Sequence, residues 1–508
     1  MSGGIFQSQN KIRAGAYINF KSVPKPLTTV GTRGVATLAI PLSWGDTLTE
    51  LYSTDLTDGS SLAKVGLDVT DDAALLLRKH LTHCYKSFIY RLDTGGEKAE
   101  ATIGSKKFTA KYVGTFGNNI QIVIVQNLYA YQASTTGKIY TEEALAKDVI
   151  VYSDETLETV VGVVTDYSNT SGTIKIKIDG GTEETVTEAT SDAITYTVHT
   201  VVSGVKKNTQ TVSTGNELVD NEFVDFGEGD TLQVTAGTAL TGGTDGTVNN
   251  AAYTAYLAEM GNHKFDTMGL PYATAPAVLQ AAKLFITQQC EQYGRKCKLV
   301  VKNSVTDSDY VINVINGYVT TEETVTPEIF VAEVTGMDAG ANINESLTYK
   351  VIADPEKAVS IINKVADKDI EKALNSGKFI LSKRDDGAIV VEKDINSLHT
   401  FTPYKNYAFS KNRVKRTLDE IANTVKLTWE KSYVGKVDNN ESGRGIFKGD
   451  IINYLTILQD TYAAIQNFNS ATDIEVLAGN DIDSVVCNLS IQPVDSMEKL
   501  YMTVNVNG

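Results

Sequence analysis

In the first half of the chain, apolar residues recur most clearly at every second position, which is the period of a β-strand. Residues 173–178 (TIKIKI) alternate in this way and are followed by an Asp-Gly-Gly turn. Residues 193–202 and 231–234 predict further short strands, and residues 35–40 predict a strand closer to the start of the chain. One helix is predicted in this half, over residues 71–90, because acidic residues open it and basic residues follow.

From about residue 249 the pattern changes to helices that alternate with strands. Amphipathic helices are predicted at 250–262 and 275–294, and strands at 264–270, 295–302 and 310–315. This order predicts an α/β layer with a largely parallel sheet. The elements predicted after it are, in order, a helix at 327–337, a strand at 346–352, a helix at 355–375, a hairpin of 378–383 with 387–392, helices at 413–431 and 449–467, and a β-rich tail from 473 to 506.

The tail ends in an apolar strand pattern close to the last residue of the chain. Val485, Cys487, Leu489 and Ile491 alternate with polar neighbours, and the same alternation returns nearer the end. The apolar residues of this second run are Leu500, Met502, Val504 and Val506. An apolar terminal strand either closes a sheet of its own chain or offers an exposed edge to another chain. The pattern alone leaves both alternatives open.

Residues 141–250 differ sharply in composition from the rest of the chain. They contain 19 Asp or Glu, 5 Lys and no Arg, and so carry −14 of the total formal charge of −16. They also contain 22 Thr and 16 Val, which favour the half-buried surface of a sheet because branching at Cβ restricts χ1. We interpret the segment as an antiparallel β domain inserted into the main body. It is simply a solvated β module, and this is compatible with an outward-facing domain whose like charges discourage lateral clumping.

The total charge and the cysteines narrow the class of protein. A formal charge of −16 argues against a nucleic-acid partner, because phosphate binding requires a surplus of Lys and Arg. The four cysteines, at positions 84, 290, 297 and 487, form no CxxC pair and indicate reduced thiols in a protein made in the cytoplasm. A disulfide between Cys290 and Cys297 is an open alternative. No run of 18 apolar residues predicts a membrane-spanning helix, and residues 1–17 lack the apolar stretch of a secretory signal, so we expect no membrane anchor.

Few residues form a pattern with recognisable chemistry. His80, His83 and Cys84 have helical spacing and could contact one metal ion, but without a partner cluster a packed helix is the better interpretation. The acidic residues of 225–230 lack the spacing of an EF-hand. The chain has no HExxH motif and no phosphate-binding loop, and its five histidines lie in no recognisable triad context. The sequence therefore predicts no enzyme activity, no cofactor and no metal.

Longer stretches of sequence resemble one family closely. The two most specific are VAEVTGMDAGANINESLTYK at 331–350 and DINSLHTFTPYKNYAFSKNRVKRTLD at 394–419. Further matches are GGIFQSQNKIRAGAYINF at 3–20, YVGKVDNNESGRGIFKGDIINYLTIL at 433–458 and IQPVDSMEKLYMTVNV at 491–506. These stretches are similar to the contractile tail sheath proteins of phages and phage-derived particles. The resemblance covers roughly the first 40 and the last 260 residues well, and the middle poorly.

The resemblance implies a multi-domain α/β and β fold, with a central α/β layered sheath domain, a C-terminal α+β domain, an inserted antiparallel β domain and extended N- and C-terminal arms. We expect the following divisions: an N-terminal arm at 1–30, the N-terminal part of the sheath core at 31–95, the acidic β-rich insertion at 96–248, the α/β sheath domain at 249–395 and the C-terminal domain with its terminal strand arm at 396–508.

The resemblance also implies a function and partners. The chain would polymerise with its own copies as stacked hexameric rings around an inner tail tube, and would contract to drive that tube through the target cell envelope. The other expected partners are the tail tube, baseplate and tail terminator proteins, with no nucleic acid and no membrane anchoring. The expected location is the tail of a virion or of a phage-tail-like particle, after synthesis in the cytoplasm of a bacterial host.

Two sets of residues are candidate contacts between subunits. In the sheath family, terminal arms add strands to sheets of neighbouring subunits. Carried over to this chain, the donor residues are Ala14, Gly15, Ala16, Tyr17, Ile18, Asn19 and Phe20 at one end, and Leu500, Tyr501, Met502, Thr503, Val504, Asn505 and Val506 at the other. The second set consists of basic residues clustered in one motif: Lys405, Lys411, Arg413, Lys415 and Arg416. They could pair with carboxylates of a neighbour or of the tube, or they could simply form a solvated helix start.

Two other classes of protein remain as alternatives. The Thr- and Val-rich acidic segment suits a surface-layer or adhesin-like structural protein. The long α/β section and the missing signal peptide argue against this class. A hydrolase built on the α/β layer would need a catalytic triad, and the sequence shows none.

Overall fold

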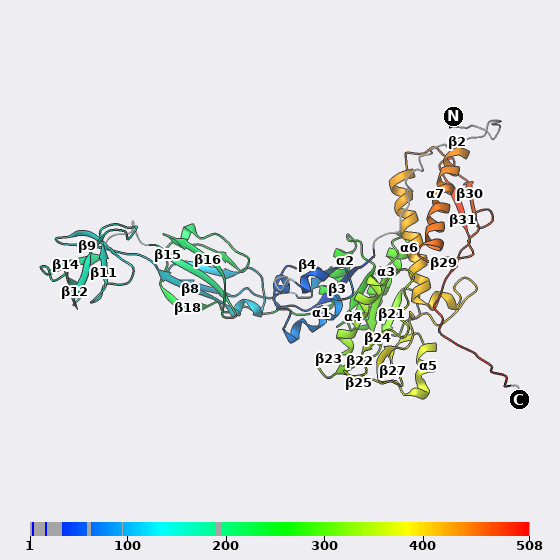
Figure 1. The fold of residues 1–508 in the computed structure, drawn as a ribbon, viewed down its shortest axis with the longest axis horizontal. Coiled ribbons are helices and arrows are strands. Elements are labelled where there is room, and N and C mark those ends of the chain that lie inside the picture. Colours follow the sequence, from blue (N-terminus) through cyan, green and yellow to red (C-terminus); the bar gives the residue numbers. More distant parts are fainter. Residues whose placement is uncertain are drawn as a thin grey trace.

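The computed structural model describes residues 3–4, 16–17, 33–57, 62–93, 95–188 and 195–506. Four parts follow one another along the long axis of the molecule (Figure 1). A closed β-barrel lies at one end, a two-sheet β unit comes next, and an α/β layer follows. Helices α6 (Asn412–Thr428) and α7 (Glu441–Asp460) lie at the opposite end.

The α/β layer is built on a seven-stranded sheet. Its strands are, in spatial order, β26 (Lys378–Phe379), β21 (Val311–Val314), β20 (Lys298–Lys302), β19 (Thr267–Leu270), β3 (Val35–Ile40), β5 (Lys86–Arg91) and β4 (Leu48–Tyr52). All neighbours are parallel except β4, which runs antiparallel to β5. The predicted, largely parallel sheet is therefore confirmed. Its inner strands are buried along almost their whole length because helices cover both faces.

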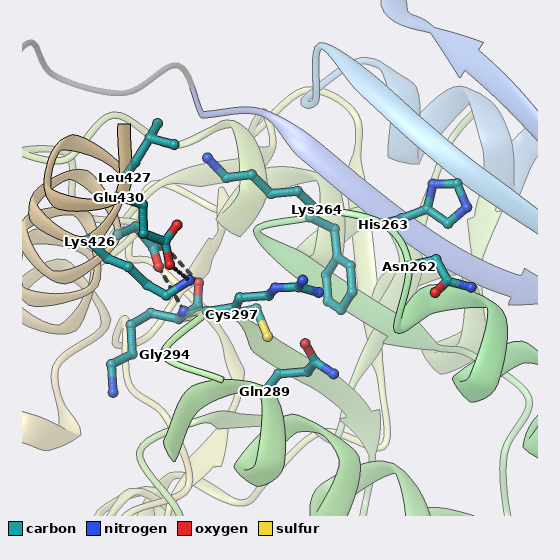
Figure 2. A pocket seen from close by; sticks show the side chains of 13 residues that line it. Asn262, His263, Lys264, Gln289, Gly294, Cys297, Lys426, Leu427 and Glu430 are labelled. Carbon is teal, nitrogen blue, oxygen red and sulfur yellow. Dashed lines mark hydrogen bonds and ion pairs between the residues drawn. The ribbon is translucent and has the colours of Figure 1, made fainter. Parts of the chain in front are cut away.

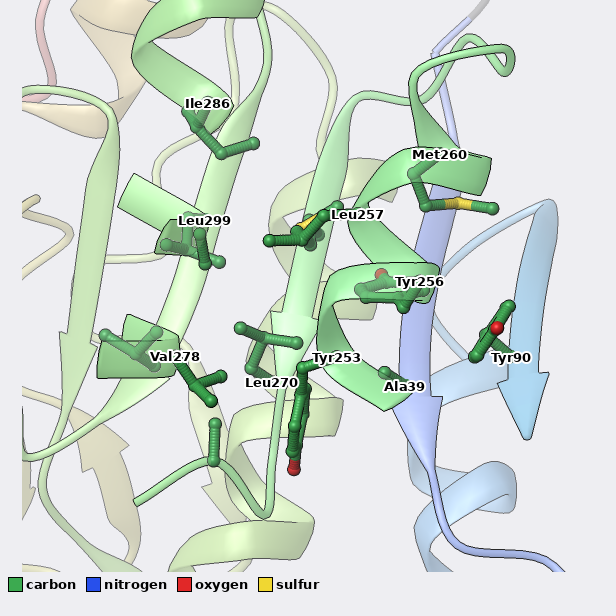
Figure 3. Packing of buried hydrophobic residues seen from close by; sticks show 14 of the residues in the cluster. Ala39, Tyr90, Tyr253, Tyr256, Leu257, Met260, Leu270, Val278, Ile286 and Leu299 are labelled. Atoms are coloured by element: carbon green, nitrogen blue, oxygen red, sulfur yellow. The ribbon is translucent and has the colours of Figure 1, made fainter. Parts of the chain in front are cut away.

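Four helices cover the sheet: α2 (Asn250–Met260) and α3 (Pro276–Glu291) on one face, and α1 (Leu75–Leu81) and α4 (Pro327–Gly340) on the other. On the first face, Tyr256 and Met260 of α2 lie against β3 (Figure 3). The Tyr256 hydroxyl is 2.9 Å from that of Thr37 in this strand. The helices predicted at 250–262, 275–294 and 327–337 are confirmed, with shifts of a few residues at their ends.

The helix predicted at 71–90 is wrong in its second half. The α-helix ends at Leu81, and residues 86–91 form β5, a strand inside the sheet. Phe88, Ile89 and Tyr90 are all buried, so the run has no polar face. A short continuous apolar run does not distinguish a buried strand from a helix, and here the aromatic and β-branched residues favour the strand.

The helix predicted at 355–375 is also wrong. Ala358–Ile362 form strand β25, which pairs with β22 (Gly317–Thr320), and only Ile370–Asn375 are α-helical, as α5. Three β-branched residues within β25, Val359, Ile361 and Ile362, favour an extended backbone over a helix.

The strands around this correction complete two small antiparallel sheets. The hairpin predicted at 378–383 and 387–392 is confirmed as β27 (Leu381–Lys383) with β28 (Ile389–Val391). The strand predicted at 346–352 begins later, as β24 (Val351–Ala353), and pairs with β28. Strand β23 (Thr324–Val325) pairs with β22.

Two β units lie between β5 and α2, where the sequence predicted a single domain. The inner unit has sheets in the orders β16-β15-β8-β18 and β17-β7-β6 around one shared hydrophobic core. The outer unit is a six-stranded barrel of β9 to β14, inserted between β8 and β15, and it has a core of its own. Composition did not separate them because both are antiparallel and rich in Thr and Val. The shift at residue 141 falls inside the barrel, at the last residue of β10.

The strands of the two units are β6 (Glu100–Ile103), β7 (Lys106–Ala110), β8 (Ile120–Gln126), β9 (Tyr129–Ala133), β10 (Gly137–Thr141), β11 (Ile150–Tyr152), β12 (Val160–Thr170), β13 (Thr173–Ile178), β14 (Glu184–Glu188), β15 (Tyr196–Val202), β16 (Val205–Val212), β17 (Val224–Phe226) and β18 (Thr235–Ala239). The strand predicted at 173–178 is confirmed as β13. The one predicted at 231–234 is wrong, because β18 begins only at Thr235.

Trp44 joins the inner β unit to the α/β layer. It lies in the loop after β3, yet its buried indole belongs to the core of the inner β unit, where it packs against Tyr112, Phe116 and Phe223. The inner and outer β units, β6 to β18, together form a β extension, which is therefore docked on the α/β layer by a side chain of that layer.

The C-terminal part packs α6 and α7 against short β-pairs. A π-helical turn (Trp429–Tyr433) extends α6. Asn440 caps α7 by accepting a hydrogen bond from the Gly443 amide, so this helix starts eight residues before the predicted 449. The pairs are β29 (Ile465–Gln466) with β32 (Gln492–Pro493), and β30 (Ile474–Ala478) with β31 (Val485–Leu489).

Candidate functional site: the C-terminal arm and the charge cluster at its base

The C-terminal residues leave the body as an extended, exposed arm. Residues 494–506 carry no helix or strand in the described part of the chain, and the arm projects away from the helices in Figure 1. Its apolar side chains are largely in solvent: Leu500 is 84% exposed, Met502 73%, Val504 69% and Val506 88%. Strand-like apolar alternation without a partner strand is a template for pairing with another chain.

The N-terminal arm is described only in part. Ala16 and Tyr17 form strand β2, which pairs in parallel with Gly3 and Gly4 of β1. The other predicted donor residues, Ala14, Gly15, Ile18, Asn19 and Phe20, lie outside the described residues. Strand donation by this arm stays a prediction.

A cluster of buried charges lies where α6 begins. Arg416 of α6 donates to Asp338 of α4 at 2.6 Å and to Asp394 at 2.7 Å, and all three side chains are 0% exposed. Lys298 of β20 donates to the same Asp338 at 2.9 Å, and Asn412 donates to Asp394 at 2.9 Å. The cluster therefore ties α4, β20 and the segment before α6 to the first turns of α6.

The charges in this cluster shift one another's proton affinity. Burial alone would raise the pKa of Asp338, but the nearby Lys298 and Arg416 charges outweigh it and hold that pKa well below its usual range. Burial lowers the pKa of Lys298, against the pull of Asp338. Buried charges of this kind are tolerated because each has an opposite partner within hydrogen-bonding distance.

This arrangement corrects one prediction about the basic residues of the motif. Lys411, Lys415 and Arg416 are buried and paired within the chain, so the contact predicted with a neighbour or the tube is wrong for them. Lys405 pairs with Asp309 at 2.8 Å but keeps partial exposure. Arg413 is half-buried, and burial lowers its pKa. For these last two an intersubunit contact stays a prediction.

No pattern in the sequence indicates this pairing, because the partners are distant along the chain. Asp338 lies 78 residues before Arg416, and Lys298 a further 40 residues before Asp338. The one indication of a role for Asp338 in the sequence is its place in GMDAG at 336–340, within one of the stretches that resemble the sheath family.

The glycines of the same motif have a separate role. A Cβ atom at Gly336 would overlap the carbonyl oxygen of His80, and one at Gly340 would overlap that of His83. Only glycine lets α4 approach the end of α1 this closely. The motif thus combines a tight helix contact with the central carboxylate of the charge cluster.

His80 of α1 supports packing rather than a metal site. His80 is fully buried, with Nδ1 2.7 Å from the Ala332 carbonyl oxygen and Nε2 2.8 Å from the Ser87 hydroxyl. Burial lowers its pKa to about 4. Within the described ranges, no group of three or more His, Cys, Asp or Glu side chains is placed to hold a metal ion. The Cys290 thiol lies 3.3 Å from the Cys297 carbonyl oxygen, and both cysteines are free thiols.

A basic pocket lies between α6 and the loops that precede β19 and β20 (Figure 2). Its volume is about 250 Å³, and Lys264, Arg295 and Lys426 are among its cationic lining residues. Lys426 pairs with Glu430 at 2.9 Å, at a partly exposed position. The lining offers no nucleophile and base in hydrogen-bonding contact, so the pocket does not define a reaction.

These features together define a multi-domain α/β and β protein with an exposed apolar chain end. None of the helices in the described part of the chain is long and apolar enough to span a membrane. Residues 246–397 match the family model of the phage tail sheath protein central domain, and residues 404–507 match that of the phage tail sheath C-terminal domain. Over 518 aligned residues and 100% of both chains, the sequence is 32% identical to the phage-like element PBSX protein XkdK of Bacillus subtilis (strain 168). The chain belongs to the phage tail sheath family.

Solved structures agree with this assignment. The crystal structure of the sheath tail protein from Desulfitobacterium hafniense matches with a TM-score of 0.72 and 31% identity, covering 95% of this chain and 98% of that one. The helical sheath of the anti-feeding prophage in its contracted state shares the fold, with a TM-score of 0.50 and 11% identity over 97% of this chain and 98% of that one. The resemblance stated from the sequence is confirmed, and a structural sheath subunit is favoured over the surface-layer and hydrolase alternatives.

Proposed function

We propose that copies of this chain assemble as stacked hexameric rings around an inner tail tube and contract to drive the tube through a target envelope. The observation that carries the proposal is the exposed apolar arm at 494–506, in a chain of the sheath family. Contraction needs rigid domains that change their contacts while staying linked, and it needs no nucleotide site because the energy is stored in the assembled lattice. The partners are the tube, baseplate and tail terminator proteins of a virion tail or tail-like particle.

The arm links subunits by strand donation. Residues 500–506 add a strand to a sheet of a neighbouring copy, with several backbone hydrogen bonds worth about 1 kcal/mol net each. Four apolar side chains that are 69% to 88% exposed in the single chain leave water on pairing. Ordering the strand opposes this gain by about 1–2 kcal/mol per residue, so one link is modest. Many links per particle hold the lattice together through contraction. Residues 14–20 act in the same way at the other end.

The β extension faces away from the tube. It lies at the end of the molecule opposite α6 and α7, and most of the net negative charge falls within it (Figure 1). Like charges on the outside of neighbouring particles repel, which keeps long particles dispersed.

The test compares the full chain with a variant that lacks residues 499–508, by negative-stain microscopy with and without tube protein. The full chain should build tubes or helical arrays, and the truncated chain should remain a folded monomer. Val504→Asp should weaken assembly, whereas Val305→Asp, at a fully exposed position in the α/β layer, serves as the matched control. Normal sheaths from the truncated chain would show that this arm is not the connector.

A further inference from the structure

The base of the C-terminal arm is held on the body by a buried lysine. The Lys411 side chain is only 2% exposed, which is unusual for a lysine. Its ammonium group contacts the Glu498 carboxylate and lies 3.6 Å from that of Asp495. Both carboxylates belong to the segment that follows the last strand, β32. The negative charge that compensates the buried Lys411 ammonium group is therefore supplied by the arm itself.

Glu498 has further contacts with the body. The Thr348 hydroxyl donates to its carboxylate at 2.8 Å, and the Lys393 ammonium lies 3.8 Å from it. The same Thr348 hydroxyl accepts a hydrogen bond from the Asp394 amide at 3.0 Å. Since Asp394 pairs with Arg416, the arm is connected through Thr348 to the buried charge cluster.

The change from anchored to free chain is abrupt. The Glu498 side chain is 13% exposed, whereas Leu500, two residues later, is 84% exposed. Burial alone would raise the pKa of Glu498, but the hydrogen bond and charge of Lys411 outweigh it and lower that pKa. The carboxylate therefore remains ionised, and paired, at neutral pH.

We infer that Glu498 is a latch, that is, a positioning residue that fixes the place and direction in which the arm leaves the body. Residues 500–506 therefore extend towards a neighbouring copy from a fixed starting point. The inference rests on the proposed strand donation. With the latch closed, the free chain is residues 499–506, which reaches about 26 Å when extended. With the latch open, only the longer pair of the partly exposed Asp495 with Lys411 holds the base of the arm, and once it parts the free chain is residues 494–506, which reaches about 43 Å.

The longer tether weakens donation in two ways. The effective concentration of a tethered strand falls roughly as the −3/2 power of tether length, which is about twofold for this change. The strand also no longer leaves the body in a fixed direction, and this lowers the rate of pairing with the neighbouring copy further. Releasing the latch should therefore slow polymerisation by at least about twofold per link while leaving the donated strand unchanged.

The experiment measures arm mobility and assembly separately. In a Cys487→Ser background, which removes the exposed thiol, Met502→Cys is labelled with a maleimide dye. Glu498→Gln should lower the fluorescence anisotropy of the dye in the monomer and slow polymerisation, and Glu498→Asp should restore part of both. Glu430→Gln, which breaks the surface pair with Lys426, should change neither.

The outcomes separate the latch from the proposed function. Unchanged anisotropy in Glu498→Gln overturns the latch, and so does a freed arm that assembles at the full rate. If the variant lacking residues 499–508 assembles normally, strand donation fails, while the anisotropy still reports on the latch. Should Glu498→Gln not fold because Lys411 then keeps only the longer 3.6 Å pair with Asp495, the double variant Lys411→Met with Glu498→Gln removes the buried cation and gives the same readout.

Discussion

Replacement of Arg416 by Met should destabilise the junction between the α/β layer and the C-terminal helices. The substitution removes hydrogen bonds to Asp338, Asp394 and the Glu345 carbonyl oxygen, at 2.6, 2.7 and 2.8 Å. Asp338 keeps Lys298 and Asp394 keeps Asn412, but both carboxylates stay buried with one cation fewer. Removing one partner of a buried charge network costs about 3–5 kcal/mol of unfolding free energy.

The pH dependence of this loss has a definite sign. In the native protein the pKa of Asp338 is lowered, so its contribution is present above the unfolded pKa, near 3.9, and is lost as the pH falls below that value. In the Arg416→Met variant the pKa of Asp338 rises, because this buried carboxylate loses one of its nearby cations. The folded variant then binds protons more readily than the unfolded chain does, and the destabilisation should be smaller at pH 5 than at pH 7.

The assay uses one tryptophan near the junction. The chain has two, and Trp44→Phe leaves Trp429, at the end of α6, as the reporter of urea unfolding. The control is Lys426→Met, which breaks a partly exposed pair and should cost less than about 1 kcal/mol. An Arg416→Met loss no larger than the control, or one that grows as the pH falls from 7 to 5, would refute the reasoning.

Three further predictions concern packing, pH and the β extension. Gly340→Ala should destabilise the protein by several kcal/mol, because the added Cβ overlaps a backbone oxygen, whereas Gly445→Ala in α7 has open space and should stabilise it by about 0.5–1 kcal/mol in thermal melts. His80 has a pKa of about 4 in the folded protein against 6.5 in the unfolded chain, so the free energy of unfolding should fall as the pH drops from 6.5 towards 4. His80→Gln should flatten this pH dependence, and an unchanged pH dependence would rule out His80 as its source. Replacing residues 128–194, a range that contains the barrel strands β9 to β14, by a short Gly/Ser linker should leave sheath assembly intact by microscopy, because the barrel has its own core and loop changes cost little closure entropy. Failure to assemble would give the barrel a connecting role.

The sequence predicted the parallel sheet well, because strands such as β20 and β21 are short apolar runs between clear helices. It failed at β5, where an apolar run buried on both faces has no period to distinguish a strand from a helix. The division of the insertion into two units was also missed, since both units share one composition and differ only in which residues form each core.

Of the candidate site, the sequence predicted the part that depends on a local pattern and missed the part that depends on contacts between distant residues. The apolar alternation at 500–506 is local and could be found in the sequence, and its exposure in the structure is what makes it a candidate link. The pairing of Lys411 with Glu498, and of Arg416 with Asp338, depends on tertiary contacts across 87 and 78 residues. A cluster of basic residues read alone therefore suggested an outward contact, while the fold turns three of its members inward.

The most direct test of the central claim is a helical cryo-electron microscopy reconstruction of the assembled particle. The account predicts continuous density for residues 500–506 as an added strand, hydrogen-bonded to a sheet of a neighbouring copy. Density that folds these residues back onto a sheet of their own chain, in an intact lattice, would contradict it.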